Sequence, residues 1–196
     1  ETAAPSAAFN DRLLVITRDQ LFDVVERRVA NEIRNALKRY YNAFRFFPFA
    51  SRYDDGTFAC TAGLTRGRIP NADLLPAHPL RDCPGHADWQ PEMSPAIAPP
   101  SWFAANDWHL LTHYAVAPAC TRATLNCSGS GFLRVNELTG VGAVVVVGGR
   151  EIASLGQVRP CLTEIDCIEQ PFAATGEYRS TPRSNSFNDR VAIIVP

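Results

Sequence analysis

Residues 17–44 read TRDQLFDVVERRVANEIRNALKRYYNAF, and this segment carries the strongest structural signal in the chain. Thr17 and Gln20 match a capping box, in which each side chain accepts a hydrogen bond from the other residue's backbone amide. Apolar residues then recur with a step near four, as on one face of a helix. They are Leu21, Val25, Val29, Ile33, Leu37, Tyr41 and Phe44. The pattern predicts one amphipathic helix from about 17 to 44, stopped before Pro48 and roughly 40 Å long at ~1.5 Å per residue.

This helix is much longer than the average of about 11–12 residues in globular proteins, so its apolar stripe needs a broad surface to cover it. The second half of the chain supplies strand candidates at 108–116, 132–135, 143–147 and 191–195. Residues 143–147 are AVVVV, apolar on both faces, which is typical of a central strand. For residues 108–116 alternation favours a strand, and a helix capped by Asn106 is the alternative. We predict an α+β fold in which the long N-terminal helix packs on an antiparallel β-sheet.

The 196 residues are enough for one sizeable domain. We expect residues 1–16 to form a tether and residues 17–196 one globular domain. Within that domain we expect the helix at 17–44, a loop region at 46–107 and a β-meander at 108–196. The loop region contains eight prolines between Pro70 and Pro100, a density that excludes regular helix and central strand.

Six cysteines form three consecutive pairs, separated by 23, 7 and 6 positions: Cys60 and Cys83, Cys120 and Cys127, Cys161 and Cys167. An even number of cysteines with close local pairs favours three disulfides, and the sequential pairing is preferred because it closes each loop locally. A zinc site is the alternative, but the usual C-x2-C spacing is absent. Disulfides imply an oxidising compartment, so we expect the periplasm, the cell surface or the medium.

The net charge and the hydropathy of the chain argue against some classes of function. The formal net charge of −1 argues against a nucleic-acid binder, which normally has a basic excess. No apolar run approaches the ~18–20 residues needed to cross a bilayer. We therefore expect any export signal or membrane anchor to lie upstream of Glu1.

The sequence motifs that would indicate a metal site, a cofactor site or a catalytic site are weak. His109 and His113 could bind a metal from one helix face, but no H-E-x-x-H signature accompanies them. Asp54 and Asp55 could supply calcium ligands, although D-D-G also makes a common turn. Gly140 and Gly142 precede a strand, whereas the glycines of a dinucleotide-binding motif follow a strand and begin a helix, so this motif is rejected. We predict no catalytic residue, no metal site and no cofactor, and we expect that the protein is not an enzyme.

Several stretches together resemble the type IV pilin family, which includes pilins, minor pilins and the pseudopilins of type II secretion. Residues 21–49, ending in Phe47-Pro48-Phe49, are similar to the second half of the pilin helix. The pattern Trp102-x3-Asn106-x-Trp108, followed by Tyr114-Ala115-Val116, resembles a stretch of some minor-pilin-like proteins. Residues 140–149 and 187–191 resemble the strand and closing segments of the same group. The resemblance covers most of residues 13 to 196.

The resemblance implies a structural subunit of a type IV pilus or a type II secretion pseudopilus, acting in filament assembly, adhesion or protein export. Its implied partners are other pilin or pseudopilin subunits. In this family the helix begins with an apolar, membrane-embedded half, which residues 1–16 do not provide, and the full-length protein would be anchored in the inner membrane by it. Loops between residues 50 and 100 and around Cys161–Cys167 would face neighbouring subunits or cargo.

Two other classes of function remain as alternatives. One is an exported binding module that recognises carbohydrate or protein through Trp89, Trp102 and the Pro-rich loop. The other is a secreted hydrolase that uses a cluster of Asp107, His109 and His113.

Overall fold

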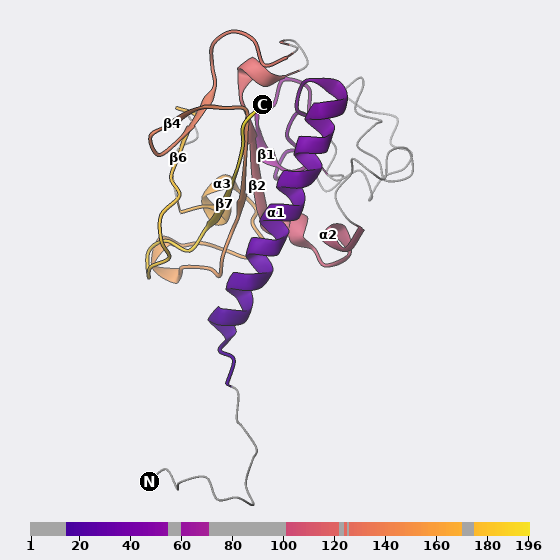
Figure 1. The fold of residues 1–196 in the computed structure, drawn as a ribbon. Coiled ribbons are helices and arrows are strands. Elements are labelled where there is room, and N and C mark those ends of the chain that lie inside the picture. The colour runs from indigo at the N-terminus through magenta and orange to yellow at the C-terminus, as the bar shows by residue number, and fades with distance from the viewer. Residues whose placement is uncertain (1–14, 55–59, 71–100, 122–123, 125, 170–174) are drawn as a thin grey trace, which may run out of the picture.

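A computed structural model describes residues 15–54, 60–70, 101–121, 124, 126–169 and 175–196 of the chain (Figure 1). One long helix, α1 (Arg18–Phe44), lies along one side of a set of β-strands. The main sheet is antiparallel throughout. The α+β class with a long N-terminal helix on an antiparallel sheet is therefore confirmed.

The ends of α1 follow from local hydrogen bonds. Thr17 is the N-cap, and its hydroxyl accepts a hydrogen bond from the Gln20 amide at 3.2 Å. The Thr17 amide donates in return to the Gln20 side chain at 2.9 Å, which completes the predicted capping box. At the other end Arg45 adopts a left-handed conformation, with φ 63°, and its amide donates to the Tyr41 carbonyl. The helix thus ends shortly before Pro48.

The buried face of α1 is rotated slightly from the predicted stripe. A step of four residues drifts around a helix with 3.6 residues per turn, so Leu21 leaves the buried face and Val25 and Tyr41 lie at its margin, still packed against the core. Leu21 is exposed, and Val25, Tyr41 and Phe44 are only partly buried. The residues that α1 buries are Glu26, Val29, Ala30, Ile33, Ala36, Leu37 and Tyr40.

The main sheet has the strand order β1-β2-β5-β7. Its strands are β1 (Arg66–Arg68), β2 (Thr112–Val116), β5 (Ala143–Val147) and β7 (Arg190–Ile194). Every residue of β2 and β5 is buried. The central position predicted for residues 143–147 is confirmed, since β5 pairs with β2 on one side and β7 on the other.

A second, smaller sheet has the order β4-β3-β6. It comprises β3 (Leu133–Val135), β4 (Leu138–Val141) and β6 (Glu177–Tyr178). A β-meander over 108–196, as predicted, would pair consecutive strands in one sheet. The structure instead distributes the strands of this region over two sheets. The β3–β4 hairpin leaves the main sheet between β2 and β5, and β3 pairs with β6 in parallel.

Short helices and turns connect the strands. They are α2 (Ser101–Ala105), η3 (Trp108–Leu111), η4 (Pro118–Cys120), η6 (Ala153–Leu155) and α3 (Glu164–Cys167). The strand predicted for residues 108–116 begins only at Thr112, because η3 occupies its first four positions. The predicted loop region 46–107 also contains β1 and α2, and β1 forms there because it completes the hydrogen bonds of the outer edge of β2.

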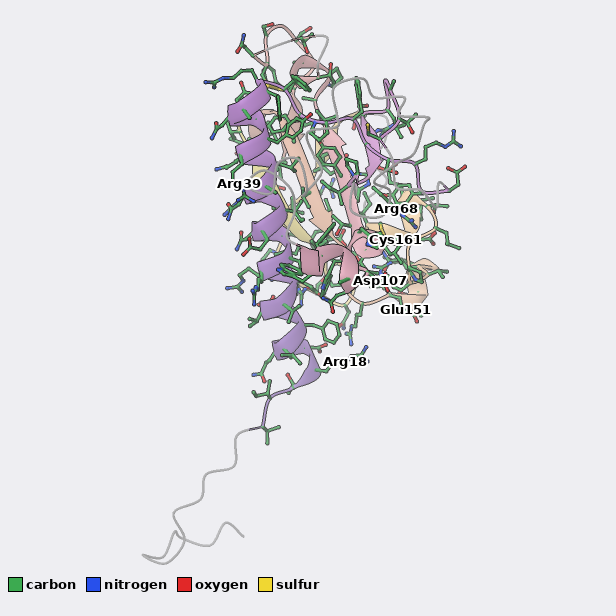
Figure 2. The ribbon with its side chains drawn as sticks, turned by 90° about the vertical axis from the view of Figure 1, so that its right-hand side faces the viewer. Arg18, Arg39, Arg68, Asp107, Glu151 and Cys161 are labelled. Carbon is green, nitrogen blue, oxygen red and sulfur yellow. A yellow bond between two sulfur atoms is a disulfide. The ribbon has the colours of Figure 1, made fainter. Side chains whose placement is uncertain are left out.

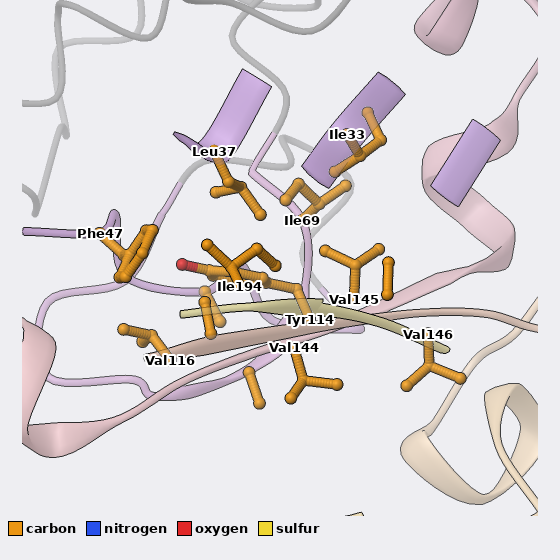
Figure 3. Packing of buried hydrophobic residues seen from close by; sticks show 14 of the residues in the cluster. Ile33, Leu37, Phe47, Ile69, Tyr114, Val116, Val144, Val145, Val146 and Ile194 are labelled. Carbon is orange, nitrogen blue, oxygen red and sulfur yellow. The ribbon is translucent and has the colours of Figure 1, made fainter. Parts of the chain in front are cut away.

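The core lies between α1 and the main sheet (Figure 3). Ile33 and Leu37 of α1 face Tyr114, Val145 and Ile194 of the strands, and all five side chains are buried. Since each fully buried aliphatic side chain contributes ~1.5–3 kcal/mol, this interface makes a large contribution to the stability of the domain.

Two of the three predicted disulfides are present. Cys120 is bonded to Cys127 and Cys161 to Cys167, as sequential pairing predicts. The third predicted pair includes Cys83, which lies outside the described residues. None of the described cysteines is free.

Candidate functional site

The start of α1 extends past the ends of the strands (Figure 1). We call residues 15–24 the helix overhang. It carries five large apolar side chains that are between 40% and 68% exposed: Val15, Ile16, Leu21, Phe22 and Val24. Exposed apolar side chains gathered at one end of a helix make this surface a candidate interaction site. In the sequence, the signal for this surface is Val24, an apolar residue that lies off the apolar stripe. The step-of-four pattern alone does not reveal the surface.

Ion pairs anchor α1 at the end of the overhang. Asp23 accepts hydrogen bonds from Arg27 at 2.7 Å and from Arg190 at the start of β7. Arg183 contacts the carboxylate of Glu26, which is buried, and its Nε lies 3.6 Å from Asp23. Removing one partner from a buried ion pair costs ~3–5 kcal/mol. These contacts hold the segment before β7 against the helix, at the point where α1 reaches the sheet.

A cavity of about 640 Å³ lies between the overhang and the end of β5. We call it the helix groove. Phe22, Trp108 and Leu111 supply apolar walls, and Arg18 and Arg150 are among its polar residues. The guanidinium of Arg18 stacks over the Phe22 ring at 5.2 Å, and Arg150 lies 3.8 Å from Asp19. The volume falls within the ~300–1,000 Å³ typical of ligand sites, and the mixed lining suits a partner with both apolar and acidic groups.

The two glycines that follow β5 are required by close packing at this groove. A side chain at Gly148 would place its Cβ 2.6 Å from the carbonyl oxygen of Cys167. A side chain at Gly149 would collide with the amide of Asn188. The sequence marks Gly148-Gly149 only as the end of a strand, and their part in shaping the groove depends on residues far along the chain.

His113 is at the centre of a buried polar cluster on the sheet. Its Nδ1 is hydrogen-bonded to the Tyr53 hydroxyl at 2.6 Å and its Nε2 to the Tyr178 hydroxyl at 3.1 Å. Glu164 of α3 lies 3.8 Å from Nε2. Burial, with a smaller effect from Arg66, lowers the pKa of His113 to about 3, so the ring is neutral at physiological pH. The cluster links four separate segments around a ring that has no exposed surface, which suits a structural role.

The candidate metal and catalytic residues are dispersed. His109 lies in η3 beside the Phe103 ring and His113 in β2, so the two histidines do not share a helix face. Asp107 is exposed, whereas both histidines are buried. Asp54 is paired with Arg52 at 2.6 Å, and Asp55 lies outside the described residues. Within the described part of the chain, no group of three or more His, Cys, Asp or Glu side chains is placed to hold a metal ion.

The two described tryptophans lie in different surroundings. Trp102 is partly buried beneath the guanidinium of Arg28, whose carbon lies 5.6 Å from the ring centroid. Trp108 lines the helix groove. Trp89 lies outside the described residues.

The carboxylates of Glu169 and Asp189 also hold the segment before β7 in place, through hydrogen bonds from backbone amides. The carboxylate of Glu169 accepts hydrogen bonds from the amides of Asn188 and Asp189, each at 3.1 Å. Asp189 accepts one in return from the Glu169 amide at 3.0 Å. Burial, and then the neighbouring Glu169, raises the pKa of Asp189 well above its usual value. The raised pKa favours the protonated form of Asp189, and the hydrogen bonds join residue 169 to the segment before β7.

A second exposed apolar surface lies on the ring closed by Cys161 and Cys167. Leu162 and Ile165 are 61% and 68% exposed, and we call residues 162–166 the disulfide knob. Figure 1 shows α3, which forms part of this ring, on the opposite side of the main sheet from α1. Figure 2 likewise shows Cys161 on the side of the molecule away from Arg39 of α1.

Comparisons with protein-family models, with curated proteins and with solved structures found no match. Among the described helices, none combines the length and the apolar character needed to cross a membrane. The helix overhang, the helix groove and the disulfide knob are therefore the features from which a function can be inferred.

Proposed function

We propose that this chain is the globular part of a structural filament subunit of the type IV pilus or type II secretion pseudopilus kind. The helix overhang is the observation that carries the proposal. α1 is packed on the sheet through its second half, and its first turns present Leu21, Phe22 and Val24 with much of each side chain exposed.

This arrangement fits a helix that continues into the apolar core of a filament. An isolated surface helix of a monomer buries its apolar residues on its own domain and presents charged residues elsewhere. Here the capping box holds the first turn in helical form although Val15 and Ile16 before it and Leu21 after it are exposed. A helix end that is ordered, apolar and exposed in this way is suited to packing against helices of other copies.

The disulfides support an exported location. Two local disulfides are present in a chain of modest size, and such bonds persist in oxidising compartments such as the periplasm and the cell surface. A periplasmic or surface filament is one assembly that forms in such a compartment. The filament proposal needs no bond-making chemistry, and its requirements are a rigid body and surfaces that bind neighbours.

The full-length protein provides the test. We expect its reading frame upstream of Glu1 to encode a short basic leader followed by ~20 apolar residues, the length that spans a bilayer. In cells that produce this form, Leu21→Asp with Val24→Asp should abolish recovery of the subunit in sheared filaments. Leu138→Asp is the control, since Leu138 is 46% exposed and lies on β4, away from the overhang.

Two results would defeat the proposal. One is a conventional cleavable signal peptide directly before the domain, because no helix would then continue into a filament core. The other is normal incorporation of the Leu21→Asp, Val24→Asp form into filaments, provided that the purified domain keeps its unfolding midpoint.

A further inference from the structure

We propose that consecutive copies join head to tail, with the disulfide knob of one copy seated in the helix groove of the next. This inference rests on the proposed function, because it names the contact that would propagate the filament. The occupant of the groove is thus a second copy of this chain.

The disulfide knob is built as a preformed ligand. Leu162 and Ile165 are exposed, although the ring that holds them is closed by a disulfide whose two cysteines are fully buried. Asp166 also caps α3, accepting hydrogen bonds from the Thr163 amide and hydroxyl at 2.8 Å each. Because the knob is already ordered, little conformational entropy would be lost on docking.

The helix groove offers the matching surface. Phe22, Trp108 and Leu111 form an apolar lining that two branched aliphatic side chains can cover. Aromatic residues of this kind, surrounded by arginine, are typical of the central part of a protein interface. The cavity of about 640 Å³ is large enough for a short protruding segment.

The charges of the two surfaces are complementary. Residues 161–167 contain no basic residue, and Asp166 supplies the acidic group of the knob, because the Glu164 carboxylate lies inside the molecule 3.8 Å from His113. The groove is lined by four arginines and three carboxylates, and two of those carboxylates already pair with arginines of the groove. Arg18 is held over the Phe22 ring and so is available to an incoming carboxylate. Complementary charge would raise the association rate and fix the orientation of the knob.

The position of the two surfaces determines the symmetry of the contact. The knob lies on the ring closed by Cys161 and Cys167, whereas the groove lies between the overhang and the end of β5, where Gly148 packs against the Cys167 carbonyl. A contact between two different surfaces of one chain is heterologous, and unless the rotation closes a ring it builds an open helical array. A filament needs this kind of contact, whereas a twofold dimer would use the same surface on both copies.

A mixing experiment tests the contact on residues 1–196. Ile165→Asp blocks the knob and Phe22→Asp blocks the groove, while Leu138→Asp serves as the control. By sedimentation velocity up to millimolar concentration, we expect the unaltered chain and the control to self-associate. Each single variant should associate at least about tenfold more weakly, the effect of losing ~1.4 kcal/mol of contact energy. An equimolar mixture of the two variants should form dimers that grow no further, because one intact knob meets one intact groove.

Three results of this experiment would contradict the proposed contact. An unaltered chain that stays monomeric, variants that self-associate like the control, or a mixture that stays monomeric would each overturn the head-to-tail contact. If Phe22→Asp fails to fold by circular dichroism, Arg150→Glu takes its place, since the Arg150 side chain is 64% exposed. In the full-length assay, normal filaments from Ile165→Asp would refute this contact and leave the proposed function intact. Normal incorporation of the Leu21→Asp, Val24→Asp form would instead refute the function.

Discussion

At the scale of single residues, burial changes what a side chain does. An exposed histidine titrates at about pH 6.5, but His113 has no exposed surface and sits between two tyrosine hydroxyls. Removing the ring from water disfavours its charged form, and the nearby Arg66 adds to this effect. A neutral imidazole donates from one nitrogen and accepts at the other, so it can bond both Tyr53 and Tyr178.

This burial predicts a pH dependence of stability. The folded pKa of His113 is about 3, below the unfolded value of about 6.5, so the unfolded chain binds the extra proton between these values. The contribution of His113 is therefore complete above about pH 6.5 and is lost as the pH falls towards 3, by about 1.4 kcal/mol per pH unit. Urea unfolding of the unaltered chain and of His113→Phe, between about pH 3.5 and 7, measures the difference.

We expect the variant to show a shallower loss of stability over this range. At neutral pH it should be less stable by about 1–3 kcal/mol, because the tyrosine hydroxyls lose a buried partner. Parallel pH profiles for the two proteins would contradict the assignment of His113 as a buried neutral base.

At the scale of elements, α1 is one continuous helix with two different environments. Its first turns depend on the capping box and on local backbone hydrogen bonds. Its second half is covered by β5 and β7, and Ile33 and Leu37 there have no exposed surface. Helices in proteins owe most of their stability to packing, so the two halves should respond differently to the same kind of substitution.

Leu37→Ala and Val24→Ala make a matched pair on this helix. Leu37→Ala should lower the free energy of unfolding by about 2–5 kcal/mol, because it leaves a cavity in the core. Val24 is 64% exposed, so Val24→Ala should change that free energy by less than about 0.5 kcal/mol. Denaturant unfolding of both variants is the measurement. A large loss for Val24→Ala would mean that the overhang is packed on its own domain, and the filament proposal would lose its main support.

At the scale of the whole molecule, the two disulfides stabilise connections that lie outside the main sheet. The Cys161–Cys167 ring lies between β5 and β7 in the sequence, and Cys161 donates from its amide to the Leu110 carbonyl beside β2. The Cys120–Cys127 ring follows β2, and the Cys120 carbonyl accepts from the Phe47 amide. Each ring therefore fixes a connection between segments that are distant in sequence.

Removing a ring should cost stability with little change in the sheet. Replacing Cys161 and Cys167 together by alanine should lower the free energy of unfolding by about 2 kcal/mol, as expected for a short closed loop. Replacing Cys120 and Cys127 together should cost a similar amount, which makes the two variants controls for each other. Thermal unfolding followed by circular dichroism measures both. No loss in either variant would mean that these bonds are dispensable to the fold.

Sequence patterns predicted the features that depend on near neighbours. The capping box at Thr17 and the apolar repeat located α1, because helix hydrogen bonds join residues four apart. The run AVVVV located β5 and its central position, because a strand that is apolar on both faces must be covered on both. The close spacing of Cys120 and Cys127, and of Cys161 and Cys167, identified partners that the structure joins.

Only the tertiary structure decided which distant segments meet. The β3–β4 hairpin pairs with β6 in a second sheet, Tyr53 and Tyr178 converge on His113, and the overhang forms a groove with the end of β5. These contacts join residues that are far apart along the chain, and no local pattern encodes their partners. They are selected because the chain as a whole must bury the apolar face of α1 and both faces of β5 while it satisfies the hydrogen bonds of the polar groups buried with them.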